Sequence, residues 1–317
     1  MPDIKITDDE LIRDFPKLGA TGVAQKYGMT VRVVHARRRR VEGELGIAIP
    51  SPRDKIQQHT RPSPRVRKDV KMKDGTIIVF NDAHYWPNDI STAHLALLDV
   101  CKKLKPAIVV ANGDLLDGAR ISRHPPISWE HAPELVDELE TVRLRLDEIK
   151  KAAKGAKYYW TAGNHDLRFE SKLAKEAPEF RGIKGVHLKD HFPDWIPCMS
   201  IWVNGELVIK HRFKGGIHAR HNNTLASGKS IVTGHTHQQG VTPFTDYNGT
   251  RYGVESGTLS ETFGPQYEYA EDNPRNWVSG FAVITFQDGQ LLTPEVVKVV
   301  ATGIYEFRGK RVEVVPE

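Results

Sequence analysis

Short polar segments that directly follow apolar stretches contain the residues of this chain that could perform chemistry. Carboxylate, imidazole and amide groups at the ends of buried strands can meet at one edge of a sheet and hold two divalent metal ions. Two such ions activate water against a phosphate ester. We therefore predict a binuclear metal phosphoesterase. The segments, in chain order, are Asp82-Ala-His84, Gly113-Asp114-Leu-Leu-Asp117, Gly163-Asn164-His165-Asp166, His211 and Gly234-His235-Thr-His237.

The elements that must position these groups are visible as apolar patterns. Strand–helix alternation followed by a strand-rich half predicts an α/β fold in which two sheets pack face to face with helices outside. The apolar stripe of the helix at 129–154 is expected to pack on a sheet, with a homodimer seam as the alternative. Strands are predicted at 76–80, 107–110, 157–161, 199–203, 206–210, 230–233, 251–254, 280–286 and 296–300, and helices at 91–104, 129–154 and 167–175.

Residues 1–48 form a predicted all-α domain with helices at 10–17, 21–27 and 31–45. The spacing of Ala24, Gly28 and Val34, with Thr30 as an N-cap, resembles a helix-turn-helix. Its third helix would present basic side chains to DNA. The alternative is a capping or oligomerisation domain with a solvated basic face. The basic side chains in question are Arg32, Arg37, Arg38, Arg39 and Arg40.

Charge and composition support this division of the chain. Residues 1–70 contain 15 Lys/Arg and 9 Asp/Glu, a balance of +6 against +5 for all 317 residues. Residues 49–70, rich in Pro and Arg, are predicted to be an extended linker, and 71–317 the phosphoesterase domain. No signal peptide or membrane segment is expected. The two cysteines do not form a disulfide framework, so we expect an intracellular, cytoplasmic protein.

The ordered motifs D-x-H, G-D-x-x-D, G-N-H-D, a lone His and G-H-x-H over residues 76–240 resemble the calcineurin-like metallophosphoesterase superfamily. The resemblance implies its four-layer fold and a carboxylate, Asp114, that bridges the metals. It implies manganese as the first choice of metal, with iron, zinc or nickel as alternatives. A water bridging two cations would lose a proton and attack in line. The implied ligands of the first metal are Asp82, His84, Asp114 and His237, and those of the second Asp114, Asn164, His211 and His235.

The resemblance also assigns His165 as a general acid at the leaving oxygen, rather than as a ligand. Asp117 would orient it and favour its protonated form, with a helix N-cap as the alternative role for Asp117. His211 is preferred over the nearby His218 and His221 because a strand end holds a ligand more rigidly than a loop.

Aromatic and basic residues beside the motifs could stack a base and grip phosphates. Trp86 could equally pack under a loop. The preferred hypothesis is a nuclease or phosphodiesterase acting on DNA through residues 1–70. The alternatives are a phosphatase or small-nucleotide phosphodiesterase whose basic segment serves assembly, and an inert DNA-binding protein. Asp117 departs from the histidine usual in repair nucleases of the superfamily. The proposed substrate contacts are Trp86, Arg120, Arg123 and His124.

Overall fold

The computed structural model describes residues 6–52, 66–123 and 132–315. It divides the chain into two compact units, Met1–Pro64 and Arg65–Glu317. Within the described ranges, no helix has the length and apolar character needed to cross a bilayer.

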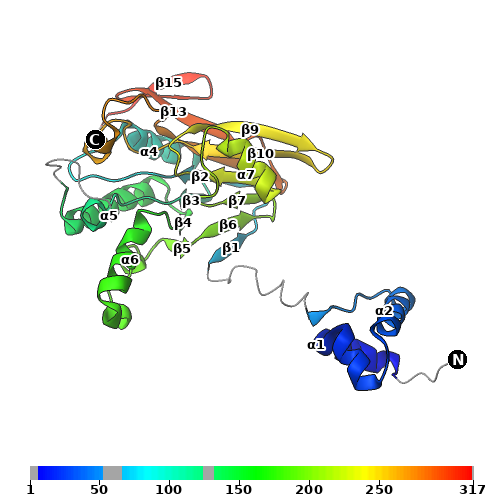
Figure 1. Ribbon diagram of the computed structural model, residues 1–317. Coiled ribbons are helices and arrows are strands. Elements are labelled where there is room, and N and C mark those ends of the chain that lie inside the picture. The colour runs from blue at the N-terminus through cyan, green and yellow to red at the C-terminus, as the bar shows by residue number, and fades with distance from the viewer. Residues whose placement is uncertain (1–5, 53–65, 124–131, 316–317) are drawn as a thin grey trace. The chain divides into compact units, whose positions relative to one another are not determined.

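The N-terminal unit is built from helices α1 (Asp8–Tyr27) and α2 (Val31–Leu45) (Figure 1). A capping box starts α1: the Thr7 N–H donates to Glu10 Oε2 at 2.8 Å, and the Glu10 N–H donates to Thr7 Oγ1 at 3.2 Å. Gly19, with a φ of 68°, interrupts α1. The two helices predicted at 10–17 and 21–27 are therefore the halves of α1 on either side of this break.

The turn between α1 and α2 has the predicted chemistry. Gly28 adopts the left-handed conformation, with a φ of 61°, and Thr30 accepts a hydrogen bond from the Val33 N–H as the N-cap of α2. Ala24 and Val34, which flank the turn, are both buried in a small core. The rest of this core is Ile6, Leu11, Phe15, Val23, Val41 and Ile49.

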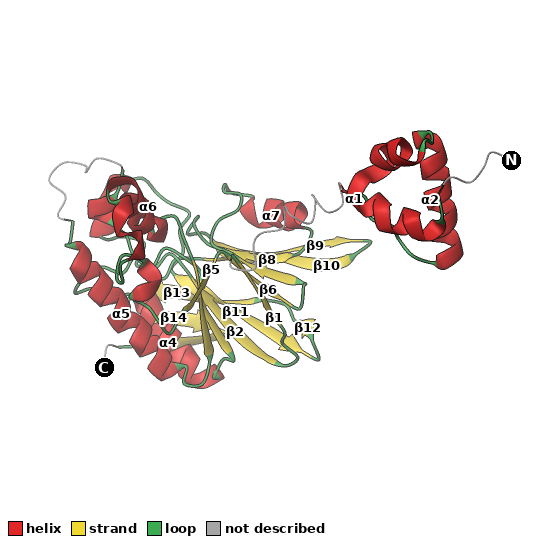
Figure 2. Cartoon of the chain, turned by 90° about the horizontal axis from the view of Figure 1, so that it is seen from below, coloured by secondary structure: helices red, strands yellow, loops and turns green. Residues whose placement is uncertain are grey.

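Two sheets make up the larger unit (Figure 2). The six-stranded sheet has the order β1-β6-β7-β8-β10-β9, and the nine-stranded sheet the order β15-β14-β13-β11-β2-β3-β4-β5, with β12 paired to β11. Strands β2, β3 and β4 pair in parallel. The strands are β1 (Arg67–Val70), β2 (Gly75–Phe80), β3 (Ile108–Ala111), β4 (Lys157–Thr161), β5 (Ile196–Cys198), β6 (Ser200–Val203), β7 (Leu207–Ile209), β8 (Ser230–Thr233), β9 (Gln239–Asp246), β10 (Gly249–Ser256), β11 (Gly280–Gln287), β12 (Gln290–Leu291), β13 (Glu295–Ala301), β14 (Ile304–Phe307) and β15 (Lys310–Glu313).

Both faces of the central strands are covered, which explains their continuous apolar runs. In β2, Ile77 and Val79 face the core between the two sheets. Ile78 and Phe80 point the other way, into the core shared with the helices. The predicted packing of two sheets face to face is confirmed.

Helices cover the outer faces and complete four layers (Figure 2). α4 (Thr92–Leu104) and α5 (Leu135–Ala152) pack on the nine-stranded sheet, and α7 (Ala219–Ser227) packs on β8, β9 and β10 of the other. The predicted stripe of α5 faces this core. α5 begins at Leu135, two residues after Pro133, because the residue before a proline disfavours helix. The predicted start near Trp129 lies outside the described residues. α6 (Asp166–Glu176) and the 3₁₀ turns Ala119–Ile121, Pro178–Gly182, Leu188–Asp190 and Pro265–Ala270 complete the list.

The end of the predicted linker was assigned wrongly. Its last four residues, Arg67–Val70, form β1, which pairs in parallel with β6 at the edge of the six-stranded sheet. The Arg67 guanidinium lies 3.9 Å from the ring centroid of Trp202 on β6. A partly buried edge strand needs no apolar run, so the charged sequence of β1 gave no sign of a strand.

Both cysteines are buried and unpaired. Burial raises the pKa of the Cys101 thiol to about 12 and that of Cys198 to about 12 as well. At neutral pH both therefore remain protonated inside the core.

Candidate metal centre

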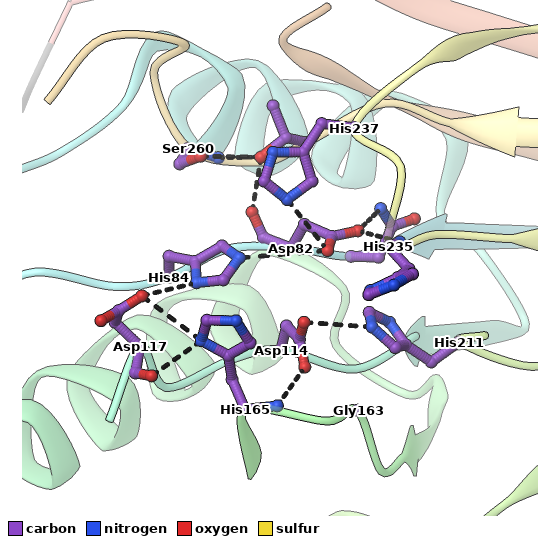
Figure 3. Close-up of polar contacts among 12 residues, drawn as sticks. Asp82, His84, Asp114, Asp117, Gly163, His165, His211, His235, His237 and Ser260 are labelled. Carbon is purple, nitrogen blue, oxygen red and sulfur yellow. Dashed lines mark hydrogen bonds and ion pairs between the residues drawn. The ribbon is translucent and has the colours of Figure 1, made fainter. Parts of the chain in front are cut away.

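The polar motifs meet at one edge of the sheets because of how the strands pair (Figure 3). Asp82 and Asp114 follow the adjacent parallel strands β2 and β3, and Asn164 follows β4. His211 follows β7, and His235 comes after β8, its parallel neighbour in the second sheet. The centre thus draws ligands from both sheets.

Asp82, His84 and His237 form the first group that could hold a metal ion. The Nε2 atom of His237 lies 3.2 Å from Asp82 Oδ1, and the Nε2 atom of His84 lies 3.9 Å from the same oxygen. The other oxygen, Oδ2, accepts a hydrogen bond from the His235 N–H at 2.8 Å. Oδ1 is therefore oriented toward the two imidazoles.

Asp114, His211 and His235 form the second group. His211 Nε2 lies 3.1 Å from Asp114 Oδ2, while Asp114 Oδ1 accepts the His165 N–H at 2.8 Å. Asp114 also belongs to a third group with His84 and His165. Asp114 is thus near His84 of the first group as well as His211 and His235 of the second. Its role as a bridging ligand, which the resemblance implies, stays a prediction.

Buried atoms without hydrogen-bond partners test whether these residues fit metal ions. Asp82 Oδ1, His84 Nε2, Asn164 Oδ1, His211 Nε2 and His237 Nδ1 are all buried and unpartnered among the described residues. A buried polar atom left unpaired normally costs about 1–3 kcal/mol. A cation bound among them would satisfy several at once, so the donor set fits two divalent ions with oxygen and nitrogen ligands.

A second layer of contacts fixes the tautomers of the histidines. His211 Nδ1 lies 2.7 Å from the Asn112 carbonyl oxygen, so in the neutral ring Nδ1 carries the proton and Nε2 can coordinate a metal that displaces the second proton. His84 Nδ1 lies 3.1 Å from Asp117 Oδ1, which has the same effect on its Nε2. Of the two alternatives to His211, His218 flanks the start of α7 and the His221 ring contacts Phe244.

The electrostatics keep both aspartates ionised. Burial on its own raises the pKa of Asp82 and Asp114, but the histidines around them outweigh it and hold both pKa values well below the usual range. For His211, burial lowers the pKa, but the carboxylates of Asp114 and Asp82 raise it to about 9. Two anionic carboxylates among imidazoles form a site that attracts divalent cations.

The glycines of the motifs are required by close approach. A Cβ atom at Gly163 would lie 2.1 Å from Asp114 Oδ1, and one at Gly234 would lie 2.7 Å from Asp82 Oδ2. At Gly113, it would lie 2.5 Å from the His211 ring. Each glycine therefore leaves room for a ligand that comes from another strand.

The ligand residues themselves carry unusual backbone geometry. Positive φ values are found at Asp82 (50°), His84 (39°), Asp114 (54°), His235 (72°) and His237 (56°). Non-glycine residues rarely adopt such values, which cluster at functional sites. The turns after the strands are shaped to direct these side chains inward.

Asp117 connects His165 to the centre. Its Oδ1 atom lies 3.4 Å from His165 Nδ1, which is also 2.8 Å from the Asp117 carbonyl oxygen. Burial lowers the pKa of His165, but Asp117 and Asp114 outweigh it, and the net pKa is raised. Asp117 makes no N-cap hydrogen bond, since Gly118 flanks the following 3₁₀ turn.

Two partners of the centre were missed by sequence reasoning. Asp166, the last residue of the G-N-H-D motif, accepts hydrogen bonds from five donors, including the backbone N–H groups of Asp114 and Gly163. Arg168 Nη2 lies 3.1 Å from His165 Nε2. The motif contained the signal for Asp166, because a buried acid after a turn must find donors.

The residues predicted to contact substrate are not brought together in the way that the metal-ligand groups are. The Arg120 guanidinium pairs with Glu134 at 2.8 Å and donates to the carbonyls of Ala132 and Pro133. Trp86 is half-buried and Arg123 is exposed, while His124 lies outside the described residues. Their contact with a substrate stays a prediction.

Residues 75–239, a little more than half of the chain, match the model of the calcineurin-like phosphoesterases. The chain belongs to this family, as the motifs predicted. A Gene 54 protein of Mycobacterium phage L5 is 28% identical over 265 residues, covering 75% of this chain and 98% of the phage protein. A Gene 54 protein of Mycobacterium phage D29 is 28% identical over 247 residues, covering 71% and 93%.

Solved structures that match this chain include Vps29 of Entamoeba histolytica, in a crystal structure of its complex with zinc. It is 14% identical with a TM-score of 0.39, and the match covers 75% of this chain and 98% of that one. Another is a serine/threonine phosphatase of Saccharomyces cerevisiae with similarity to human phosphatase PP5. It is 12% identical with a TM-score of 0.36, and the match covers 75% and 85%.

Proposed function

We propose that this metal-dependent phosphoesterase is a nuclease that hydrolyses phosphodiester bonds in DNA, with manganese as its preferred ion. The observation that carries the reaction class is the first and second ligand groups, which the third group of His84, Asp114 and His165 connects. Two divalent ions in such a site supply Lewis acidity and lower the pKa of water.

The protein's own groups would hold the phosphate and the proton. Because His165 Nδ1 is turned to Asp117, its Nε2 atom is the one that can serve a leaving oxygen. When His165 is protonated, its Nε2–H and the nearby Nη2–H of Arg168 are both donors and cannot bond to each other. Both can instead donate to one phosphate oxygen, which would orient the ester for cleavage.

The DNA part of the proposal relies on two arginines of α2. Arg32 and Arg39 are exposed and take part in none of the ion pairs among the described residues. The other three basic side chains named from the sequence are engaged within the unit. Arg37 and Arg40 pair with Asp8 at 2.8 and 3.1 Å, and Arg38 pairs with Glu42 at 2.9 Å.

The test measures Mn²⁺-dependent cleavage and salt-dependent binding of labelled single- and double-stranded DNA. We expect His165→Ala to lose cleavage and keep binding. The double variant Arg32→Ala/Arg39→Ala should weaken duplex binding and lower the salt slope by about 2, since each phosphate contact contributes about 0.9. The control Arg13→Ala/Lys17→Ala removes the same charge from α1 of the same unit and should leave binding nearly unchanged.

A second candidate keeps the chemistry and changes the substrate to a phosphomonoester or small nucleotide. The observation in its favour is the apolar surface of the N-terminal unit, which suits assembly into a homodimer as well as DNA binding. Cleavage of a monoester without cleavage of DNA would select it. No turnover of any ester with the metals bound would instead select an inert DNA-binding protein. The exposed apolar side chains are Leu18, Val31, Val33, Leu45 and Ile47, each 40–56% exposed.

A further inference from the structure

An aromatic wall lies against the first metal-ligand group and has no part in the chemistry described above. It comes from the segment between β10 and β11 and consists of Tyr267, Tyr269 and Trp277. The Trp277 ring centroid is 4.5 Å from that of His237. Tyr267 is 5.6 Å from the rings of both His84 and His237.

The wall runs from the buried centre to the surface. Tyr267 is 4% exposed, and its hydroxyl is anchored on Ser260 at 2.6 Å. Trp277 is half-buried, Tyr269 is 51% exposed and Phe263, earlier in the same segment, is 88% exposed. The inner end is thus fixed by hydrogen bonding, whereas the outer end presents aromatic surface to solvent.

Arg275 adds a positive charge to this wall. Its guanidinium lies 4.4 Å from the Trp277 centroid and 5.2 Å from the Tyr269 centroid. None of the ion pairs among the described residues involves Arg275. A guanidinium close to two rings and without a carboxylate partner keeps donors available for an anion or the edge of a base.

We propose that this wall binds the nucleobase next to the scissile phosphate, with Trp277 and Tyr269 as stacking surfaces and Arg275 gripping the base edge or a neighbouring phosphate. The inference rests on the proposed phosphodiesterase function. A phosphate bound to a metal ion that Asp82 and His237 hold would lie near Trp277, because the His237 and Trp277 ring centroids are 4.5 Å apart. A nucleoside is the common substituent that is planar, aromatic and followed by another anionic phosphate.

The experiment compares two diesters that share one leaving group. Thymidine 5′-(p-nitrophenyl phosphate) carries a base, and methyl p-nitrophenyl phosphate does not. Full-length protein with Mn²⁺ is assayed as wild type, Trp277→Ala, Trp277→Phe and Arg275→Ala. Trp202→Ala is the matched control, because Trp202 also stacks under an arginine, Arg67, but on β6.

We expect Trp277→Ala to lower kcat/KM about 10-fold for the thymidine substrate and less than 2-fold for the methyl one, in line with the loss of one base–aromatic stack. Trp277→Phe should restore most of the loss, and Arg275→Ala should give a smaller selective loss. An equal loss on both substrates would mean that Trp277 only positions His237, and would overturn the proposal. So would unchanged kinetics.

A binding measurement separates this inference from the proposed function. Quenching of tryptophan fluorescence by thymidine 5′-monophosphate needs no turnover, and should be weaker in Trp277→Phe than in wild type or Trp202→Ala. If wild type hydrolyses neither diester, the phosphodiesterase proposal fails, and the quenching still decides whether the wall takes a base. Equal quenching in Trp277→Phe and wild type would overturn the wall as a base site.

Discussion

Replacing Gly163 by alanine should damage the metal centre while the fold persists. The backbone of Gly163 does not have a positive φ, so alanine meets no conformational barrier there. Its Cβ atom would, however, stand 2.1 Å from Asp114 Oδ1 and 2.4 Å from the Asp114 nitrogen, where ordinary contact begins at 3.4 Å. Asp114 or residue 163 must therefore move by about 1 Å.

The size of this shift sets the expected effects. Overpacking of this kind costs about 1–3 kcal/mol, which lowers the melting temperature by roughly 2–12 °C for a unit of this size. A catalytic group misplaced by about 1 Å loses roughly 100-fold in rate. Loss of a well-placed ligand should weaken Mn²⁺ binding by at least about 10-fold.

The assay combines titration calorimetry with Mn²⁺, thermal unfolding and diester hydrolysis. Gly182→Ala is the control, because no atom lies within 4 Å of its added Cβ and its φ is not positive. If Gly163→Ala kept wild-type metal affinity and turnover, Asp114 could move without affecting the metal centre. The argument from close approach would then be wrong.

Asp117, Glu138 and Thr30 each give a further prediction. The Asp117 charge orients His84 and raises the pKa of His165, and Asp117→Asn removes it. Metal affinity should therefore fall about 10–100-fold, and the alkaline limb of the pH–rate profile should move to lower pH. Burial, with the nearby Asp117 charge, raises the pKa of Glu138 to about 7. The protonated Glu138 side chain stabilises the fold relative to Glu138→Gln below the ordinary pKa of 4.5, and this stabilisation is lost as the pH rises through 7. At pH 8, the free energy of unfolding measured in urea should therefore be higher for the glutamine variant than for wild type, by up to about 3 kcal/mol. Thr30→Ala removes the N-cap of α2 and should destabilise the N-terminal unit by about 1 kcal/mol, measured by circular dichroism of helix melting.

Each of these has an outcome that contradicts it. An unmoved pH–rate profile in Asp117→Asn would mean that this carboxylate does not set the protonation of His165. Equal stability changes at pH 5 and pH 8 would show that Glu138 titrates normally. An unchanged helix melting curve in Thr30→Ala would mean that α2 does not need its side-chain cap.

The metal centre could be predicted from sequence because its ligands follow strands that are buried on both faces. Such strands are continuous apolar runs, so the ends of β2 and β3 are easily located and Asp82 and Asp114 must meet. Asp117 could be placed beside His165 by resemblance. Its contact with His84 could not, because that contact depends on the φ values of the turns.

Features that depend on contacts between residues far apart in the sequence could not be predicted. The ion pair of Arg37 with Asp8 joins residues 29 positions apart, so a run of arginines looked free when part of it is neutralised. The aromatic wall comes from a segment without regular periodicity, where no pattern indicates that Trp277 returns to His237. The edge strand β1 was not predicted either, because its charged sequence has no local pattern that distinguishes a strand from a loop.

The two buried cysteines have a practical consequence for labelling. The sequence holds only these two thiols, and burial keeps both in their unreactive protonated form. A cysteine introduced at Gly43, on α2, where an added Cβ atom touches nothing, would therefore react with maleimide dyes far faster than either native thiol. A dye at that position would test whether the N-terminal unit binds nucleic acid, in a measurement that does not depend on ester hydrolysis.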